Sequence, residues 1–518
     1  MTSDRWFQLL FIFALLVGSI LRLADLPSKT LHSDEAVQAY KFGTLLDTGE
    51  YVYDPHEYHG PSLYYFSLPI AKLRGQESYR DIDEWTLRLV PALFGILLLL
   101  SFLLFLPAFG WAGVGGGCLL AALSPPFVYF SRYYVQEMIL VAATVALVGC
   151  LYRWFRSQRV GWMLLAGLCL ALMHMSKETF VISCFAIVVA GLGVQVFQGR
   201  RGDQAQLNSS FFRWLIPPIK LSHLFVGATV AAGISMLFFS SFFSNPQGVL
   251  DSVLTYLNYL HRAEGSGHEK PFGYYASLLW FQKSQGFYWG EAIVLLLGSL
   301  GCVAGFLNPR LRAWAVFITL YATVAFLFYS AIPYKTPWIL LNLEIPLLLG
   351  AGLLLASFRH VKRHGKRQGK QRLIPVSLLF IILACAQYPQ NKRVNHTYTA
   401  DQRNPYAYAH TTANYRELPD KIVELQKIDP ALKVAMYGPN YWPLPWDLRA
   451  MTNLVYSAGI PEEVPEDHVL IVDSEYSEQL EKGLSEAYAV PSLSGLRPNV
   501  MLWVYIRSDI FEKFIESR

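Results

Sequence analysis

The sequence predicts a polytopic α-helical membrane protein with about eleven transmembrane helices, followed by a small C-terminal extracytoplasmic α/β domain. Composition is the first indication: 53% of the 518 residues are hydrophobic and only 16% are charged, whereas soluble proteins carry about 25% charged residues. The second is length, because apolar runs of roughly 17–22 residues, each able to cross a ~30 Å hydrocarbon layer, recur to about residue 388. Beyond it the apolar runs shorten to strand length.

We therefore expect a transmembrane domain at 1–388, with outward loops at 24–85 and 244–288, and an extracytoplasmic α/β domain at 389–518. The predicted membrane-spanning helices are 6–23, 86–107, 112–130, 134–152, 160–176, 179–198, 221–243, 289–307, 313–332, 337–357 and 373–388.

Lys and Arg residues indicate the orientation, because short loops rich in them stay on the cytoplasmic side. With the N-terminus inside and the first span an uncleaved anchor, four basic loops face the cytoplasm, namely those with Arg153 to Arg159, Arg200 to Lys220, Arg310 to Arg312 and Arg359 to Arg372. These residues explain the net charge of +5 beside anionic membrane lipids, so we expect no nucleic-acid partner. We expect a multi-pass protein of the cell (plasma or inner) membrane.

The first outward loop carries the candidate chemistry. Residues Asp34 to Leu46 have the pattern of a short amphipathic helix, which Ser33 or Asp34 can cap. Asp34 and Glu35 stand in its first turn, where a helix dipole favours carboxylates even without a catalytic role. A second helix is expected around Leu63 to Phe66, in the membrane interface.

Three histidines, His32, His56 and His59, share this loop with the two acids. Such ligands suit zinc or manganese, yet the loop contains no tight HxxxH or HxH pair. No cofactor is certain; a divalent metal ion on Asp34, Glu35, His56 and His59 is left open. The six cysteines all lie in predicted spans and form no CxxC motif.

Charged residues also occur in three outward turns between spans, embedded in aromatic and proline-rich sequence. They are Arg132 with Glu137, Lys177 with Glu178, and Lys335 beside Tyr334. Long cationic side chains can simply reach toward lipid headgroups. Ionisable groups at such depth usually serve a site, however, and three outward cations suit an anionic ligand such as a phosphate or pyrophosphate.

The second outward loop is rich in Tyr and Trp, which predicts an interfacial aromatic belt or, as a second reading, a sugar-stacking lid with a hairpin around Gly265 and Gly267. In the tail we expect strands at 433–437, 468–472 and 500–505 and a helix at 477–489. The aromatic turn at 441–446 fits packing better than carbohydrate binding, and Asn395 begins a glycosylation sequon.

The motifs taken together resemble the glycosyltransferase C superfamily of polyprenyl-phosphate-sugar-dependent membrane enzymes, including the dolichyl/polyprenyl-phosphate-mannose-protein mannosyltransferases. The likeness is greatest to the flippase-activity-associated membrane protein family. It covers about residues 1–450, and Gly60 departs from a family pattern that has proline there. The stretches that carry it are Asp34-Glu35, His59-Gly60-Pro61-Ser62-Leu63, Ser131-Arg132 with Glu137, Lys177-Glu178-Thr179, Pro333 to Trp338 and Asn404 to Tyr408.

The resemblance implies an inverting sugar transfer on the extracytoplasmic side, from a polyprenyl-phosphate-linked sugar donor to an acceptor protein, glycan or lipid. Asp34 would be the catalytic base and Glu35 its catalytic partner. Arg132, Lys177 and Lys335 would bind the donor phosphate. The supporting residues would be His56, His59, Glu137, Glu178 and Tyr334.

Two other functions remain open. A lipid-linked sugar flippase, transporter or accessory to one fits the family likeness, although transporters usually place charges near the bilayer midplane and show internal repeats, which this sequence does not. A receptor or scaffold explains the tail but not the outward charges. Neither the sugar nor the acceptor can be read from the sequence.

Overall fold

A computed structural model of the chain describes residues 3–56, 59–199, 220–262, 269–359, 369–461, 467–484, 487–489 and 491–517. Most of two predicted basic loops and the centre of the second outward loop, including Gly265 and Gly267, lie outside these described residues. The chain forms two compact units. The helical unit comprises residues 1–26, 50–69 and 88–397, and the mixed unit comprises 27–49, 70–87 and 398–518.

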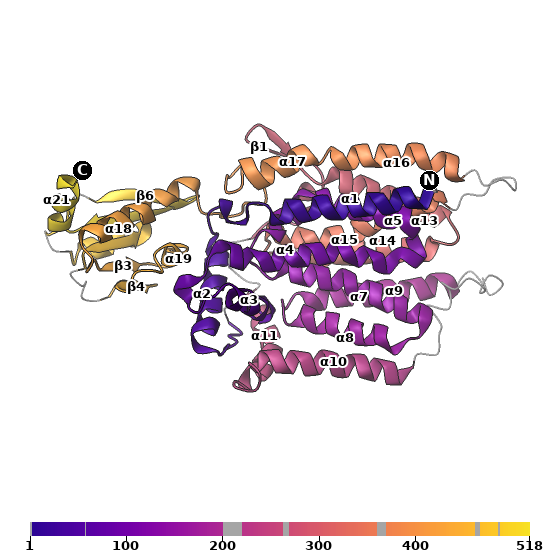
Figure 1. Ribbon diagram of the computed structural model, residues 1–518, viewed down its shortest axis with the longest axis horizontal. Coiled ribbons are helices and arrows are strands. Elements are labelled where there is room, and N and C mark those ends of the chain that lie inside the picture. The colour runs from indigo at the N-terminus through magenta and orange to yellow at the C-terminus, as the bar shows by residue number, and fades with distance from the viewer. Residues whose placement is uncertain are drawn as a thin grey trace. The chain divides into compact units, whose positions relative to one another are not determined.

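Apolar helices occupy all eleven segments that the sequence predicts as membrane spans, and in the helical unit they run side by side (Figure 1). They are α1 (Ser3–Leu23), α4 (Glu84–Ser101), α5 (Leu106–Leu123), α6 (Pro125–Ser131), α7 (Glu137–Ser157), α8 (Val160–His174), α9 (Phe180–Gly199), α10 (Leu221–Phe239), α13 (Ala292–Leu307), α14 (Arg312–Ala331), α15 (Leu340–Arg359) and α16 (Gly369–Cys385).

Eight stretches of the described chain are long and apolar enough to cross a membrane, and α8 and α13 are shorter apolar helices. One of the eight, Glu84–Leu123, includes both α4 and α5. The expected span at 112–130 is divided, because α5 ends at Leu123 and Pro125 begins α6. The class of fold is confirmed, and the number of membrane crossings stays a prediction.

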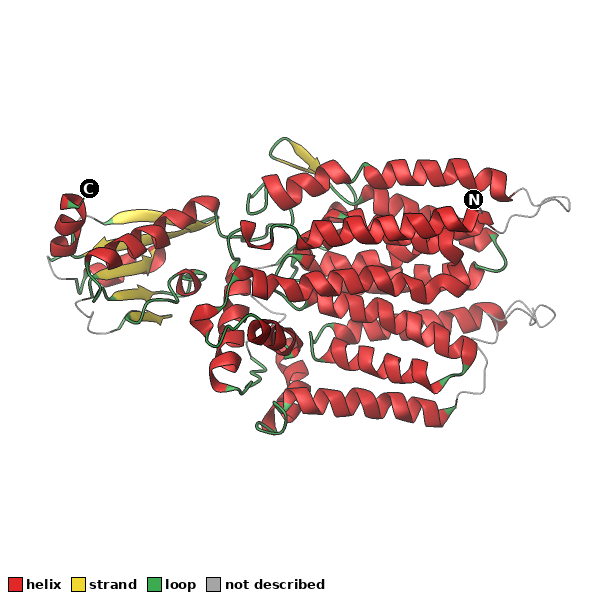
Figure 2. Ribbon diagram, in the orientation of Figure 1, coloured by secondary structure: helices red, strands yellow, loops and turns green. Residues whose placement is uncertain are grey.

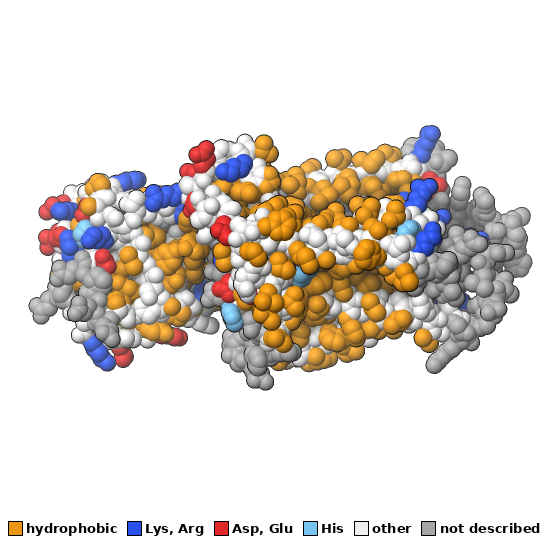
Figure 3. Space-filling model, turned by 90° about the horizontal axis from the view of Figure 1, so that it is seen from below, with side chains coloured by type: hydrophobic (Ala, Val, Ile, Leu, Met, Phe, Trp, Pro, Cys, Tyr) orange, Lys and Arg blue, Asp and Glu red, His pale blue; other side chains and the backbone are white. Residues whose placement is uncertain are grey.

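Hydrophobic side chains cover most of the described face of the helical unit that Figure 3 shows. On α1, Leu9, Phe13, Leu16 and Ile20 recur at helical spacing and are each at least 48% exposed. In contrast, within the segment Pro337–Phe358, which contains α15, every residue of the most apolar window is buried. A helix bundle that buries one helix in protein and exposes large apolar side chains around it is built for lipid surroundings, so this is a multi-pass membrane protein.

Glycines let α13 and α15 approach closely. A Cβ atom on Gly301 would lie 1.8 Å from the Gly350 carbonyl oxygen, and one on Gly298 would lie 2.6 Å from that of Leu347. Small residues at helix contacts are typical of membrane proteins, where close backbone packing replaces the hydrophobic driving force. The residue numbers rise together along the contact, so the two helices run parallel.

The predicted helices of the first outward loop are present as α2 (Ser33–Thr48), in the mixed unit, and α3 (Ser62–Leu73). Gly49 ends α2 with a φ of 75°, the left-handed conformation that favours glycine at a helix C-terminus. The second outward loop forms α11 (Gln247–Arg262), α12 (Tyr274–Leu279) and an antiparallel hairpin of β1 (Gln282–Ser284) and β2 (Phe287–Trp289).

Strands gather in the mixed unit (Figure 2) in a five-stranded sheet of order β4-β3-β5-β7-β6. Strands β3 and β4 are parallel, as are β3 and β5, whereas β7 pairs antiparallel with β5 and β6. The elements of this unit's tail are α18 (Glu417–Ile428), β3 (Val434–Tyr437), α19 (Leu444–Asp447), β4 (Leu454–Ser457), β5 (Val469–Asp473), α20 (Ser477–Glu481), β6 (Ser492–Arg497), β7 (Val500–Ile506) and α21 (Ser508–Glu516).

The three strands expected here are confirmed, but the helix expected at 477–489 is wrong in length. It ends at Glu481, a turn with Gly483 follows, and Tyr488 pairs with Arg507 as an isolated bridge. Glycine destabilises a helix interior, so the helix stops before it.

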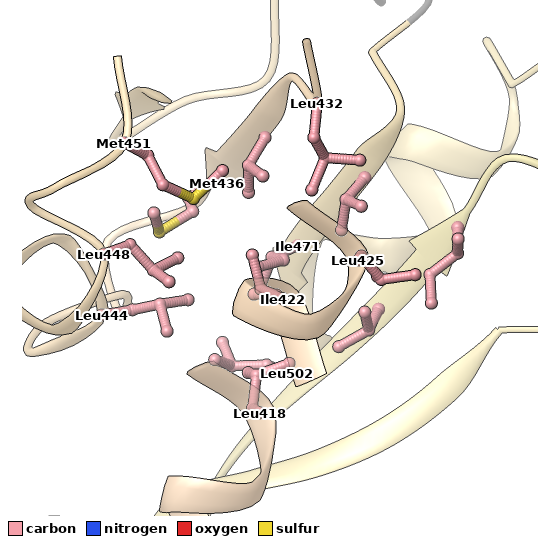
Figure 4. Close-up of a cluster of buried hydrophobic side chains, with 14 of the residues drawn as sticks. Leu418, Ile422, Leu425, Leu432, Met436, Leu444, Leu448, Met451, Ile471 and Leu502 are labelled. Carbon is pink, nitrogen blue, oxygen red and sulfur yellow. The ribbon is translucent and has the colours of Figure 1, made fainter. Parts of the chain in front are cut away.

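The core of the mixed unit lies between the sheet and α18. Leu418, Ile422 and Leu425 of α18 recur at helical spacing and pack over Met436 and Ile471 of the strands (Figure 4). The opposite sheet face is also buried, with a second cluster that includes Leu470 and Val472. Burial on both faces explains why β5 is a continuous apolar run and not an alternating one.

Candidate functional site

A glycine fixes the first loop against the turn between α8 and α9. A Cβ on Gly60 would lie 2.2 Å from the Met175 carbonyl oxygen. The next residues continue the contact: the Ser62 amide donates to Met175 O over 3.0 Å, and the hydroxyls of Ser62 and Ser176 are 2.9 Å apart. Gly60 therefore departs from the family's proline at a position where the backbone approach leaves no room for a side chain.

This contact brings His59 and Glu178 together. His59 Nδ1 lies 2.8 Å from Glu178 Oε2, and Tyr53 donates its hydroxyl to Oε1 of the same carboxylate over 3.2 Å. Burial, with the Glu178 charge next in importance, raises the pKa of Tyr53, which therefore remains a neutral donor. Tyr51 in turn donates to the His59 carbonyl oxygen over 3.0 Å.

Lys177, the neighbouring residue, pairs with Glu137 at the start of α7, and both side chains are at least 91% buried. The Lys177 ammonium also lies 5.8 Å from the centre of the Trp338 ring, a distance at which the ring face attracts a cation. A buried ion pair costs desolvation but holds its groups in one geometry. Two predicted residues from separate turns, Lys177 and Glu137, are thus brought together.

Lys335 is held differently. Its ammonium donates to the carbonyl oxygens of Lys270, at 3.0 Å, and Ile332, while Glu269 and Tyr334 form a backbone bridge. Burial lowers the pKa of Lys335. Within the described residues Lys335 has no carboxylate partner. Among the described residues, the hydrogen-bond partners of its ammonium are thus carbonyl oxygens. Tyr334 is 43% exposed.

Arg132 ends α6 and is also solvated by carbonyls. Its guanidinium donates to Asp25 O over 2.7 Å and to Asn395 O over 3.3 Å. In the described part of the chain it forms no ion pair with Glu137, although the two are close in sequence. These contacts give Arg132 a role in joining the chain segments around residues 25 and 395, whatever else it binds.

A cavity of about 430 Å³ adjoins the turn that carries Lys177 and Glu178. His174, at the end of α8, and Phe180, at the start of α9, line it on either side of that turn. The remaining lining is mostly aliphatic side chains of α8 to α11, with Ser235, Ser252 and Tyr256 as polar exceptions. An apolar cavity next to a charged turn suits an amphiphile.

In the mixed unit, the α2 cap differs from the prediction. His32 is the N-cap: its Nδ1 accepts the Asp34 amide at 3.0 Å, and Glu35 Oε2 accepts the His32 amide at 3.1 Å. The expected cap by Ser33 or Asp34 is therefore wrong, because a histidine ring nitrogen takes the place of the usual oxygen. His32 Nε2 donates to Tyr408 O over 2.9 Å, which requires the neutral Nε2–H tautomer.

The two acids of α2 differ in environment. Glu35 is fully buried and is used by the cap, whereas the Asp34 side chain is 47% exposed. Two residues of the tail, Tyr408 and Arg497, interact electrostatically with Asp34. Burial, and after it the Asp34 charge, raises the pKa of Tyr408. Burial lowers the pKa of Arg497. Asp34 is therefore the carboxylate available to a ligand, and Glu35 orients the helix that carries it.

The metal candidates fall in both units: Asp34 and Glu35 in the mixed unit, His56 and His59 in the helical unit. His56 is exposed, and its amide donates to Asp54 Oδ1 over 2.8 Å. Across the residues that the structure describes, no three His, Cys, Asp or Glu side chains gather as metal ligands.

The structure also tests two predictions about the tail, the glycosylation sequon at Asn395 and the aromatic turn at 441–446. The amide nitrogen of Asn395 donates to Asn391, and the side chain is 3% exposed, so the sequon is not accessible in this fold. The aromatic turn packs as expected, with Trp442 5.9 Å from Tyr441 and 6.0 Å from Tyr456, ring centre to ring centre. Trp442 also lies 5.9 Å from Tyr40 of α2.

Sequence reasoning missed Tyr53, Tyr408 as a neighbour of Asp34, and Arg497. Tyr51 and Tyr53 are two residues apart in an extended segment, and both contact the His59–Glu178 pair. Because alternate residues of an extended segment point to the same side, the sequence pattern could have predicted that these two tyrosines share one face. Arg497 lies on β6, far from α2 in sequence, and nothing local marks it.

Two solved structures share the fold of this chain. The chain is similar to ArnT from Cupriavidus metallidurans bound to undecaprenyl phosphate, at 16% identity, covering 98% of this chain and 99% of that one with a TM-score of 0.63. It is also similar to the oligosaccharyltransferase of Archaeoglobus fulgidus in the apo form, at 13% identity, covering 99% of this chain and 78% of that one with a TM-score of 0.57. The chain therefore has the glycosyltransferase C fold, as the motifs indicate.

Part of the chain also matches a family model. Residues 37–245 match the model described as Dolichyl-phosphate-mannose-protein mannosyltransferase. This region includes His59, Glu137, Lys177 and Glu178. No curated protein matches the chain by sequence. Residues 37–245 are thus similar to this mannosyltransferase family, and the whole chain shares its fold with the two solved structures.

Proposed function

We propose that this protein is a hexosyltransferase that moves a sugar from a polyprenyl-phosphate-linked donor to an acceptor on the extracytoplasmic side of the cell membrane, with inversion at the anomeric carbon. The observation that carries the proposal is the charged turn of Lys177 and Glu178 beside an apolar cavity, in a glycosyltransferase C fold. Similar folds support it, since ArnT was solved with undecaprenyl phosphate and AglB of Archaeoglobus fulgidus with an inhibitory peptide and a dolichol-phosphate.

The donor has two chemically different parts. Its isoprenoid chain favours apolar surroundings, for which the cavity between α8 and α11 is suited. Its phosphate needs cations, and the Lys335 ammonium and the Arg132 guanidinium both donate to carbonyl oxygens within the described chain. Lys177 would contribute to the same phosphate, with Glu137 holding its ammonium in position.

Asp34 is the proposed base. In the transfer the acceptor oxygen forms a bond to the anomeric carbon, the bond from that carbon to the phosphate oxygen breaks, and the phosphate leaves with the electron pair. Asp34 takes the proton of the acceptor hydroxyl. A partly exposed carboxylate at the start of a helix, with a buried neighbour that fixes the helix, suits this task.

The test uses the full chain, purified in detergent or liposomes, with radiolabelled polyprenyl-phosphate sugars and a mixture of protein, glycan and lipid acceptors. The wild-type protein should consume donor, and the rate of donor consumption by Asp34→Asn should be lower by a factor of at least about 100. Asp47→Asn is the matched control, because it lies on the same helix and its oxygen can still accept the Tyr79 amide. It should retain activity.

Two results would contradict the proposal. Equal donor consumption by wild type and Asp34→Asn would remove Asp34 as the base. No donor consumption, combined with passage of labelled lipid across the liposome bilayer, would favour the flippase function instead.

A further inference from the structure

Two glutamates that the proposed transfer does not use lie inside the helical unit. Glu291 immediately precedes α13, Glu344 lies on α15, and both are 0% exposed. The two helices run parallel in close contact, as Gly298 and Gly301 show. A buried carboxylate in a membrane protein costs free energy unless it is protonated or paired with a cation or hydrogen-bond donors. The groups that stabilise Glu291 and Glu344 therefore need to be identified.

The contacts of Glu291 account for its own charge. Its two carboxylate oxygens accept the side-chain amides of Gln387 and Gln390, at 3.1 Å and 3.2 Å. Among the described residues, Glu344 accepts a hydrogen bond only from the Ser124 hydroxyl, at 3.2 Å, on Oε2. In the described part of the chain no Lys, Arg or His side chain forms an ion pair with Glu344. In its ionised form Glu344 therefore has no positively charged partner among the described residues.

Glu344 interacts electrostatically with Glu291, to which Gln387 is hydrogen-bonded. One buried oxygen of each of the two outer residues, Glu344 Oε1 and Gln387 Oε1, has no hydrogen-bond partner among the described residues. Gln387 is 4% exposed, and its amide nitrogen is bonded to Glu291, so the oxygen of the same group is held beside the carboxylate. Exchanging the amide nitrogen and oxygen would bring two acceptors together, which fixes this orientation. When Glu344 is ionised, both unpartnered atoms can accept a hydrogen bond or a cation.

We propose that Glu344, Glu291 and Gln387, with the Ser124 hydroxyl, bind a hard monovalent metal cation of the sodium type. The donors are all oxygens, which hard cations prefer, and no histidine or cysteine joins them in the described chain. A single charge balances Glu344, because Glu291 is already stabilised by two amide donors. One cation supplies a partner for both unpartnered oxygens.

The bound cation would fasten four parts of the helical unit. Glu291 and Glu344 belong to α13 and α15, and Gln387 lies where α16 meets α17 (Tyr388–Lys392). Ser124 is the break between α5 and α6, and the Asn391 amide donates to the preceding Leu123 O over 3.1 Å. Occupancy should therefore raise the stability of the folded unit.

The experiment follows thermal unfolding of the full chain in detergent while NaCl replaces choline chloride at constant ionic strength. We expect wild type to show an unfolding temperature that rises with Na⁺ and saturates. Glu344→Gln, which keeps the size of the side chain, should remove this response. Asp251→Asn is the control, because it neutralises a carboxylate on α11 that accepts only the Gln247 amide among the described residues, and it should keep the response.

Each other outcome overturns the proposal. An equal Na⁺ response in Glu344→Gln would place the ion elsewhere. A response to Ca²⁺ but not to Na⁺ would show a divalent site, and a response to pH alone, equal in NaCl and choline chloride, would show that Glu344 carries a proton. If Glu344→Gln fails to fold, ²³Na NMR line broadening on wild type still decides, because no broadening relative to protein-free detergent would exclude a bound sodium ion.

Discussion

His59 Nδ1 lies 2.8 Å from Glu178 Oε2, although 119 positions separate the two residues in the chain. The pair exists because Gly60 allows the first loop to contact the Met175 backbone. His59 also shares Glu178 with Tyr53. The most distinctive polar cluster of the helical unit therefore depends on a position with no side chain.

Replacing that glycine should be harmful. In Gly60→Ala the new Cβ would lie 2.2 Å from Met175 O, so the backbone must shift and the His59–Glu178 pair must lengthen. We expect a loss of about 1–3 kcal/mol of unfolding free energy, the usual cost of overpacking, together with loss of sugar transfer. Thermal unfolding and donor consumption measure the two effects.

Gly191→Ala is the control for that substitution. Gly191 lies within α9, and a Cβ there meets no atom within 4 Å. Alanine in a helix interior should be neutral or stabilising by about 0.5–1 kcal/mol. A wild-type stability for Gly60→Ala, with activity intact, would contradict the tight contact.

The Lys177–Glu137 pair allows stability and transfer to be separated. Lys177→Met leaves a buried carboxylate alone, since the Glu137 side chain is 1% exposed, and we expect a loss of about 3–5 kcal/mol. The double variant Lys177→Met with Glu137→Leu removes both charges and should recover much of that stability. Sugar transfer should stay lost in both, because Lys177 is proposed to bind phosphate. Recovered transfer in the double variant would reduce Lys177 to a structural residue.

Local patterns in the sequence predict the helices well and their partners poorly. The apolar runs and the amphipathic pattern after Asp34 are properties of short stretches, and the structure has helices in the eleven predicted spans and α2 where these patterns indicate them. The pairing of Lys177 with Glu137 depends instead on how three helices pack, which no short pattern contains. For the same reason, nothing in the sequence marks Glu291 and Glu344, single charges within apolar runs, as charges that interact with each other.

The association of parts of the first outward loop with the tail is a second feature that local sequence patterns do not predict. Residues 27–49 and 70–87 form one compact unit with the tail, held by contacts such as the Thr411 hydroxyl donating to Leu31 O over 2.7 Å. These contacts join segments about 380 positions apart. The sequence identifies Asn404 to Tyr408 as a stretch that carries the family resemblance, but only the fold shows that the Tyr408 carbonyl oxygen accepts a hydrogen bond from His32.

The cap of α2 should weaken in acid. Burial lowers the pKa of His32 below its usual 6.5, so the folded state favours the neutral ring that accepts the Asp34 amide. The unfolded chain then binds more protons than the folded one, and stability is present above pH ~6.5 and is lost as pH falls through the lower folded pKa. Hydrogen exchange of the first-turn amides of α2, corrected for intrinsic rates, should show less protection at pH 5 than at pH 7.

His32→Asn tests the cause. Its side-chain oxygen can still cap the helix but does not titrate, so the acid loss of protection should shrink. It should not vanish, because His410, whose ring centre is 5.3 Å from that of His32, also has a pKa lowered by burial. An unchanged acid loss in His32→Asn would assign the effect to His410 or another group.

Asp447 should give the opposite pH dependence within the mixed unit. Burial raises its pKa to about 6, and Tyr415 donates to Oδ2 over 2.8 Å. Since the folded state holds the proton more tightly than the unfolded chain, its contribution is full below pH ~4 and is lost as pH rises through about 6. At pH 7 the charged carboxylate costs roughly 2–3 kcal/mol relative to the neutral acid.

Asp447→Asn should therefore raise the protection of the β3 amides at pH 7, where wild type carries the buried charge, and should have little effect at pH 4, where wild type is neutral. Hydrogen exchange in the full chain reads this unit separately from the helices. Asp420→Asn, an exposed carboxylate on α18, is the control and should leave the pH profile of β3 unchanged. Lower protection of Asp447→Asn at pH 7 would mean that the charged form is favoured there, contrary to the burial of Asp447.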